Sequence, residues 1–342
     1  MTRVKTLWVR EPYLGQILAG AKTVEVRVGY DNIRRLAPGA RLRLNDKHLA
    51  DVRRVALYSG FDDLLAHEDP AAIAPGLPAA ELLDALRQLY PPEKEALGAV
   101  ALELAPRRYD AVLFDLGYTL VYFDPPQEII VQEALRAIGA ERTTAEILAA
   151  VEVVWGEYYR DAETARFDPS EEHDRQVENE LSRGLLAALG VDAGDDAVLG
   201  AYRRALDEGF GRPDVLRPYP EAPAVLESLR SEGYRLGIVS NWSWNLRDRV
   251  RSAGLEGYFD LVWGSAYAGC NKPHPCIFEQ ALEQMALEPG RAIYVGDSYR
   301  HDVLGARRAG LAAAVLVDRR DGAAPRDCPV IPDLRGVLSL LG

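Results

Sequence analysis

Four short segments in the C-terminal two thirds of the chain place acidic, hydroxyl and basic side chains next to apolar runs. Asp115 follows the run AVLF, and Ser240 closes the run YRLGIVS. Lys272 stands just before a helical stretch, while Asp297 and Asp302 follow a further apolar run. A carboxylate at the end of a strand can act as a nucleophile or as a metal ligand.

Parallel strands would bring these side chains together, because ligands of open parallel sheets sit at the carboxyl ends of the strands. We therefore expect Asp115, Asp297 and Asp302 on one rim, with one lysine and one hydroxyl beside them. Clustered carboxylates repel one another and need a cation, and a ligand set of oxygens favours Mg²⁺. A lysine in the cluster lowers that repulsion and holds a phosphoryl group.

The elements that must position these residues alternate between strand and helix. Apolar runs predict strands at 111–114, 234–240, 261–263, 292–295 and 313–317. Helical patterns lie near 220–232, 245–254, 274–286 and 301–309. This alternation predicts an α/β fold with a Rossmann-like, doubly wound parallel sheet. Residues 126–212 hold long helical patterns and no strand, which predicts an all-helical insertion after the first strand.

The order and spacing of these motifs resemble the haloacid dehalogenase-like (HAD) hydrolase superfamily, in the branch with a helical cap inserted after the first motif. The resemblance covers residues 108–342. It implies a core of residues 108–123 and 213–342 and a cap of residues 124–212. Trp155, Tyr158, Tyr159 and Arg160 in this cap lie on a helix that could face the site, although a core stripe is the favoured interpretation, and His301 receives no role.

The resemblance also implies a role for each motif residue. Asp115 resembles the nucleophile that forms an aspartyl-phosphate. Ser240 resembles the hydroxyl that binds the phosphoryl group, with the neighbouring Asn241 helping, and Lys272 resembles the lysine that neutralises nucleophile and phosphate. The implied Mg²⁺ ligands are Asp115, the backbone carbonyl of Gly117, Asp297 and Asp302.

Gly117 departs from the family's usual first motif, DxDxT. The second Asp of that motif protonates the leaving alcohol and later activates water, and here its place is taken by glycine. Groups of this kind contribute roughly 10²–10⁴-fold in rate. Some phosphatases of the family resemble this chain in having glycine there, so activity is compatible with the sequence.

Three interpretations of this half of the chain follow. A Mg²⁺-dependent phosphatase acting on a small phosphomonoester is favoured, because the chain keeps the acidic pair Asp297 and Asp302. A 2-haloacid dehalogenase also lacks the second Asp, but it is metal-free and has no electrostatic reason to keep that pair. A catalytically impaired HAD scaffold within an RNA- or nucleotide-binding protein is the third interpretation.

The N-terminal segment LAGAKTVEVR places charged residues around a short strand. Alternation would put Lys22 on one face and Glu25 and Arg27 on the other. Lys22 and Arg27 offer contacts to phosphate, and Glu25 can orient Arg27 or accept a hydrogen bond from a base. A solvated, charged strand face is the alternative interpretation of this segment. For the basic residues of the first half of the domain, the alternative is internal pairing with its acidic second half.

The wider pattern of residues 1–105 resembles the ASCH domain, which has a PUA-like α+β barrel fold. This resemblance implies a cleft for RNA, a nucleotide or a modified nucleoside. Some small relatives are amidohydrolases that use a lysine with a nearby Thr and Glu; Lys22 matches the lysine, Glu25 replaces the threonine, and Glu68 matches loosely. We therefore interpret the domain as binding RNA or a nucleotide, which also suggests a nucleotide-related substrate for the hydrolase.

Composition limits the class of protein. With 342 residues, 48% hydrophobic and 27% charged, the chain is neither disordered nor collagenous. Residues 1–54 carry 12 Lys/Arg against 5 Asp/Glu, a local excess of +7 in a chain of net charge −12. Cys270, Cys276 and Cys328 have no CxxC spacing, so we expect reduced thiols in a cytoplasmic protein. No apolar run predicts a membrane partner, and the oligomeric state stays open.

Overall fold

The computed structural model describes residues 4–192, 194–319 and 327–341. These residues form two compact units. The first contains the described residues up to Asp110 together with Ser231–Tyr234, and the second contains Ala111–Arg230 and the described residues from Arg235 onward. The finer domain limits given above stay a prediction. Among the described residues, no helix has both the length and the apolar composition to cross a membrane.

The first unit is built on one five-stranded sheet of strand order β1-β3-β4-β5-β2. Its edge strand β1 runs parallel to β3, and the other pairs are antiparallel. Apolar side chains from the two faces of the sheet enter two separate cores. The strands are β1 (Lys5–Leu7), β2 (Val24–Val28), β3 (Arg41–Leu44), β4 (His48–Tyr58) and β5 (Ala99–Pro106).

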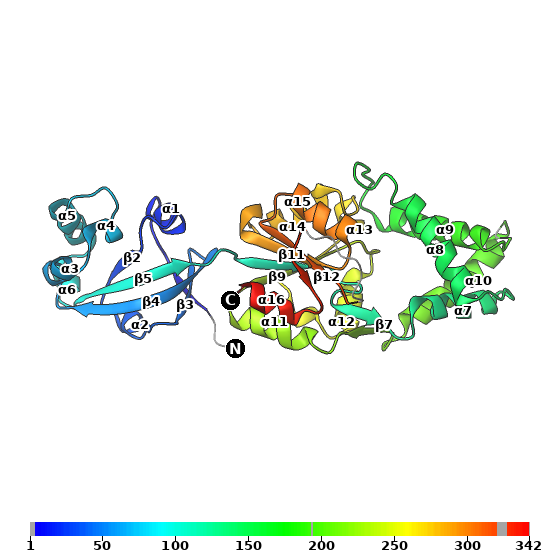
Figure 1. Ribbon diagram of the computed structural model, residues 1–342, viewed down its shortest axis with the longest axis horizontal. Coiled ribbons are helices and arrows are strands. Elements are labelled where there is room, and N and C mark those ends of the chain that lie inside the picture. Colours follow the sequence, from blue (N-terminus) through cyan, green and yellow to red (C-terminus); the bar gives the residue numbers. More distant parts are fainter. Residues whose placement is uncertain (1–3, 193, 320–326, 342) are drawn as a thin grey trace. The chain divides into compact units, whose positions relative to one another are not determined.

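Short helices connect and cover these strands (Figure 1). The longest, α5, follows Pro78 and ends before Pro91, since proline starts a helix well but cannot continue one. The helices are α1 (Tyr13–Leu18), α2 (Asp31–Arg34), α3 (Phe61–His67), α4 (Pro70–Ile73), α5 (Ala79–Leu89) and α6 (Pro92–Glu95).

The second unit contains a six-stranded, wholly parallel sheet of order β10-β9-β6-β11-β12-β13. Its central strands are buried on both faces, which explains their unbroken apolar sequences. The strands are β6 (Ala111–Phe114), β9 (Arg235–Ser240), β10 (Leu261–Gly264), β11 (Ala292–Gly296), β12 (Ala313–Val317) and β13 (Val330–Ile331).

Helices cover both faces of this sheet, with α14 and α15 on one side and α11, α12 and α16 on the other (Figure 1). The expected doubly wound parallel fold is therefore confirmed. The helices are α11 (Ala222–Ser231), α12 (Leu246–Ser252), α13 (Ser265–Ala268), α14 (Pro275–Gln284), α15 (Leu304–Arg308) and α16 (Arg335–Leu341).

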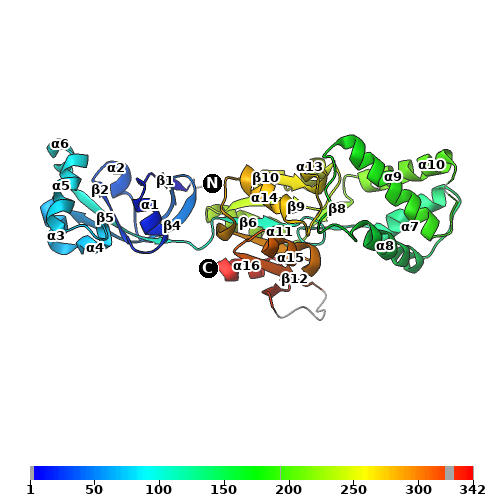
Figure 2. The same ribbon diagram turned by 90° about the horizontal axis from the view of Figure 1, so that it is seen from above.

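The four helices that the structure describes between β7 (Val121–Phe123) and β8 (Leu216–Pro218) pack on one another around a core of their own (Figure 2). A capping box of Thr143 and Glu146 starts α8. An antiparallel ribbon of β7 and β8 joins both ends of this helical insertion, and the sequence did not predict it. The helices are α7 (Gln127–Ala137), α8 (Thr144–Tyr158), α9 (Glu171–Ala188) and α10 (Asp196–Gly211).

Candidate active site

Three neighbouring strands in the middle of the parallel sheet deliver the predicted residues to one edge. Asp115 follows β6, Ser240 ends β9, and Asp297 follows β11. Because β9, β6 and β11 are adjacent and parallel, their carboxyl ends lie side by side. The predicted side chains line a cavity of about 330 Å³ at this edge, together with Lys272 and Asp302.

Lys272 lies at the centre of the cluster. Its ammonium donates to Asp115 Oδ1 and to Asp302 Oδ1, both at 2.6 Å, and to the Tyr294 hydroxyl at 2.9 Å. The residue is only 2% exposed. Burial alone would lower the pKa of Lys272, but the charges of Asp115 and Asp302 outweigh it and raise that pKa. The lysine is therefore held as a cation.

Asp115 is buried, and its two hydrogen-bond donors approach the same oxygen. Ser240 Oγ donates to Asp115 Oδ1 at 2.8 Å, beside the bond from Lys272. Burial raises the pKa of Asp115, while Lys272 acts in the opposite direction. Within the described residues, the side-chain hydrogen bonds to Asp115 leave Oδ2 without a donor.

Asn241 fixes the segment that carries the lysine. Its amide nitrogen donates to the Lys272 carbonyl at 3.1 Å, and its amide oxygen accepts from the Lys272 backbone N–H at 2.6 Å. This reciprocal pair ties the end of β9 to the start of the loop before α14. The side chain of Asn241 thus positions Lys272, and its contact with a phosphoryl group stays a prediction.

The three aspartates form a group that can hold a metal ion. Asp115, Asp297 and Asp302 bring carboxylate oxygens within 4.8 Å of one another. Asp302 is buried and accepts from the Ser298 backbone N–H at 2.8 Å, which orients it. Carboxylate oxygens at this spacing suit a hard divalent cation.

The pKa of Asp297 reflects the excess of negative charge among the three aspartates. Its carboxylate faces the cavity and is exposed there, with protein on the remaining sides. Desolvation and the charges of Asp115 and Asp302 raise the pKa of Asp297 to about 8. A bound cation would offset these charges, so the residues present fit a metal ion.

Gly117 lies in the same cavity, beneath the ring of Trp242. Apart from its chain neighbours, the one described heavy atom within 4 Å of an ideal Cβ at position 117 is Trp242 Cζ3, at 3.4 Å. Trp242 in turn stacks on Phe123, with 6.2 Å between ring centroids. Trp242 therefore both lines the cavity and packs on Phe123.

One favoured interpretation of the flanking residues was wrong. Trp155 and Tyr159 line the cavity beside Asp115, the alternative that the sequence left open, instead of forming a core stripe, because α8 ends at the cavity. His301 also lines the cavity, packed on Tyr159 with 4.9 Å between ring centroids. Burial, Lys272 and Arg300 lower the pKa of His301 to about 4, so the imidazole is neutral. The sequence signal that could have placed His301 at the cavity was its position between Asp297 and Asp302, which are close in the sequence.

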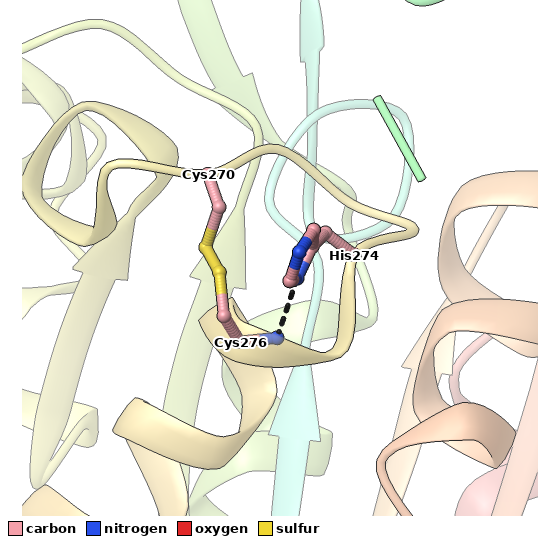
Figure 3. A group of neighbouring side chains, drawn as sticks. All are labelled: Cys270, His274 and Cys276. Atoms are coloured by element: carbon pink, nitrogen blue, oxygen red, sulfur yellow. Dashed lines mark hydrogen bonds between the residues drawn. A yellow bond between two sulfur atoms is a disulfide. The ribbon is translucent and has the colours of Figure 1, made fainter. Parts of the chain in front are cut away.

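The cysteines also correct the sequence interpretation. Cys270 and Cys276 are joined as a disulfide, with Cα atoms 6.6 Å apart, while Cys328 is free and buried (Figure 3). The turn before α14 brings the two cysteines together although they are six residues apart in the sequence, which is not the CxxC spacing. His274 Nδ1 accepts from the Cys276 backbone N–H at 3.0 Å. The sulfurs of Cys270 and Cys276 and a ring nitrogen of His274 lie within 4.8 Å of one another.

In the first unit, Lys22, Glu25 and Arg27 form one cluster instead of lying on opposite faces. Lys22 precedes β2, so strand alternation does not apply to it. Its ammonium is 4% exposed, donates to two backbone carbonyls and lies 3.2 Å from Glu25. Arg27 is paired with Glu25 and with the Trp8 carbonyl. These residues therefore pair with one another and with backbone carbonyls, and the buried Lys22 does not belong to a solvated face.

Glu68 makes its side-chain contacts outside that cluster. Both its oxygens accept from the Arg54 guanidinium at 2.7 Å, and the Tyr58 hydroxyl donates to it at 2.6 Å. Hydrogen bonds from Arg54 lower the pKa of Glu68. The Arg54 side chain is 42% exposed, which makes it a more accessible cation than Lys22.

Sequence comparison identifies relatives of both units. Residues 109–310 match the haloacid dehalogenase-like hydrolase family, and residues 7–108 match the ASCH domain. A phosphoserine phosphatase of Thermus thermophilus is 33% identical over 241 residues, covering 66% of this chain and 94% of that protein. A glyceraldehyde 3-phosphate phosphatase of Methanopyrus kandleri is 29% identical over 225 residues, covering 65% of this chain and 91% of that protein.

Solved structures share the fold of the second unit. A HAD-hydrolase of Bacillus subtilis bound to magnesium matches with a TM-score of 0.56 at 22% identity, covering 69% of this chain and 99% of that chain. An L-2-haloacid dehalogenase matches with a TM-score of 0.53 at 24% identity, covering 68% of this chain and 98% of that chain. The fold is common to both, so it does not separate the two chemistries.

Crowding of carboxylates predicts that Asp297 destabilises the metal-free protein. Its pKa of about 8, against an ordinary 3.8, means that the folded form binds more protons than the unfolded form between these pH values. The stability contributed by this group therefore falls as the pH rises through that range. In EDTA at pH 9, Asp297→Asn should raise the Tm by a few degrees, and by less at pH 5.

Asp214→Asn is a matched control, because Asp214 is exposed and lies outside the cavity. Its Tm should follow that of the unchanged protein at both pH values, as measured by differential scanning calorimetry. Equal Tm values for Asp297→Asn and the unchanged protein at pH 9 would contradict the carboxylate repulsion.

Proposed function

We propose that this chain, which belongs to the haloacid dehalogenase-like hydrolase family, is a Mg²⁺-dependent phosphomonoesterase that works through an aspartyl-phosphate. The observation that carries the proposal is the geometry around one carboxylate. Asp115 Oδ1 is held by Ser240 and Lys272, and Oδ2 is left to react. Relatives named as phosphoserine, phosphoglycolate and glyceraldehyde 3-phosphate phosphatases support a phosphorylated small molecule as substrate.

In the first half-reaction, Asp115 Oδ2 attacks phosphorus in line with the ester oxygen. The new bond from this oxygen to phosphorus forms as the bond to the leaving alcohol breaks. The Lys272 ammonium and the Ser240 hydroxyl lie within hydrogen-bond distance of the attacking carboxylate, so they can also bind the phosphoryl oxygens next to it. Water then cleaves the aspartyl-phosphate, which releases phosphate and restores Asp115.

The metal completes the charge balance. Asp115, Asp297 and Asp302, with the backbone carbonyl of Gly117, would hold Mg²⁺. When bound, the ion supplies positive charge that offsets the carboxylates and the phosphoryl oxygens. The chain itself keeps Lys272 protonated and orients Asp302 through the Ser298 backbone N–H.

Two alternatives from the sequence remain distinguishable by experiment. A 2-haloacid dehalogenase would release halide without a metal. An impaired scaffold would bind ligands without turnover. The acidic group of Asp115, Asp297 and Asp302 favours the phosphatase, because three carboxylates within 4.8 Å have an evident use only with a cation.

The decisive test measures phosphate release from a panel of phosphomonoesters with Mg²⁺ and with EDTA. Turnover should need Mg²⁺, and Asp115→Asn should lower kcat by at least about 10³-fold, since the nucleophile is lost while its shape is kept. Turnover by Asp115→Asn at the level of the unchanged protein would refute the proposal. Halide release from 2-haloacids in EDTA would support the dehalogenase.

Gly117 stands where the usual first motif of the family has a second Asp, so a substitution at this position tests what the absence of that acid costs. The space around an ideal Cβ there admits a side chain with a small adjustment of Trp242. Gly117→Asp should raise kcat for alkyl phosphates by roughly 10–100-fold, because an alkoxide leaving group needs a proton. Hydrolysis of 4-nitrophenyl phosphate, whose leaving group needs no proton, should change little.

Gly117→Asn is the matched control, because it has the same shape and no acid. Equal kcat values for the Asp and Asn variants on alkyl phosphates would show that proton donation at this position does not limit turnover.

For the ASCH domain, RNA or nucleotide binding stays our proposal. The buried Lys22 and its partner Glu25 would hold the strand in place, and Arg27 would be the residue of this cluster nearest to solvent, with a side chain 17% exposed. Arg54, more exposed, would add a phosphate contact. Glu25 takes up the charge of Lys22 and Arg27, and the rest of the local excess of positive charge in residues 1–54 supports an anionic ligand.

Binding of a single-stranded oligoribonucleotide to the full chain should weaken as salt rises, because phosphate contacts release counterions. Arg54→Ala should reduce both the affinity and the slope of that dependence, measured by fluorescence anisotropy. Arg175→Ala, on the surface of α9, is the control and should change neither. Binding that is independent of salt would argue against the proposal.

A further inference from the structure

A second cavity, of about 600 Å³, adjoins the catalytic one in the second unit. The two share part of their walls, including Tyr118, Phe123, Trp155, Tyr159 and Trp242. A molecule whose phosphate lies at Asp115 can therefore extend into the larger space. Cavities of this size bind drug-sized ligands.

The residues that line the larger cavity differ in type between the part it shares with the smaller cavity and the part beyond it. The shared part is aromatic, with Trp155 stacked on Tyr159 at 5.7 Å between ring centroids and Trp242 stacked on Phe123. Beyond it the helical insertion contributes aliphatic side chains, Val151, Leu181 and Leu206 among them, which lie between charged side chains of the insertion and polar residues of the core. An aromatic ring next to the phosphate, followed by apolar atoms, matches this order.

Charge in the larger cavity disfavours an anionic ligand. Its two arginines already have partners: Arg203 lies 2.6 Å from Glu178, and Arg249 donates to the Phe210 carbonyl. Asp174 and Glu178 also line the cavity, and burial raises the pKa of both. A substrate carboxylate would meet carboxylates here, without a free cation among the described lining residues.

One buried polar atom in the larger cavity lacks a partner. The Tyr202 hydroxyl is fully buried and makes no hydrogen bond within the described residues, yet Tyr202 lines the cavity. A buried hydroxyl without a partner costs about 1–3 kcal/mol. A ligand with an oxygen at its far end would satisfy it.

We infer that the substrate is a phosphomonoester of a bulky, uncharged alcohol that carries an aromatic ring, with the ring between Trp155 and Trp242 and the remainder in the larger cavity. This inference rests on the proposed phosphatase function and deepens it. It separates this chain from enzymes that act on small anionic phosphates such as phosphoglycolate.

The experiment compares 1-naphthyl phosphate with phosphoglycolate on the full chain in Mg²⁺. Because an aryl leaving group needs less protonation than an alkoxide, the test is the effect of Trp155→Ala and not the difference between the two substrates. This variant should lower kcat/KM for the naphthyl ester about tenfold, since loss of one aromatic contact and its buried area is worth about one tenfold step. It should lower phosphoglycolate hydrolysis by a smaller factor. Val153→Ala is the matched control: Val153 lies on the same helix, is 65% exposed and lies outside the cavity walls.

Binding of the product 1-naphthol, measured by calorimetry, separates the two proposals. If Trp155→Ala weakens naphthol binding but the unchanged protein hydrolyses neither phosphate, the cavity assignment is supported and the phosphatase proposal is overturned. An equal loss on both substrates in Trp155→Ala would overturn the inference and leave the phosphatase standing. Naphthol that binds the unchanged protein and Trp155→Ala equally would also overturn it.

Discussion

The ion pair of Lys272 with Asp115 and Asp302 is the interaction on which the arrangement of the site depends. A buried ammonium without a partner would be expensive, and so would two buried carboxylates close together. Here the Lys272 ammonium lies 2.6 Å from an oxygen of each aspartate, so the opposite charges offset one another. The lysine comes from a loop, whereas Asp115 follows β6 and Asp302 follows β11 in the sequence. The Asn241 bonds to the lysine backbone hold that loop in place.

Much of this half of the chain was predictable from sequence because its signals are local. Unbroken apolar runs marked β6, β9 and β11, and polar residues at their ends marked the rim. The ribbon of β7 and β8 was not predictable, since three-residue strands have no periodicity to detect. The positions of Trp155 and Tyr159 depend on where α8 ends relative to the sheet, which a helical pattern alone does not encode.

The first unit illustrates a different limit. A charged strand pattern gives the types of side chains but not their partners. Lys22 lies before β2 and turns inward, where two backbone carbonyls and Glu25 take up its charge. Net charge over residues 1–54 therefore overstates the positive charge available to a ligand. Cys270 and Cys276 show the same limit, because their pairing is set by a turn and not by spacing.

The pairing of β7 with β8 has a consequence for how this fold can change. Val121 is the register partner of Pro218, so the chain enters and leaves the helical insertion at neighbouring positions. Insertions, deletions or replacement of everything between these strands would leave the ends of β6, β9 and β11 in place. Natural variation can thus remodel ligand selection without touching the reacting carboxylate, and the two properties can be inherited independently.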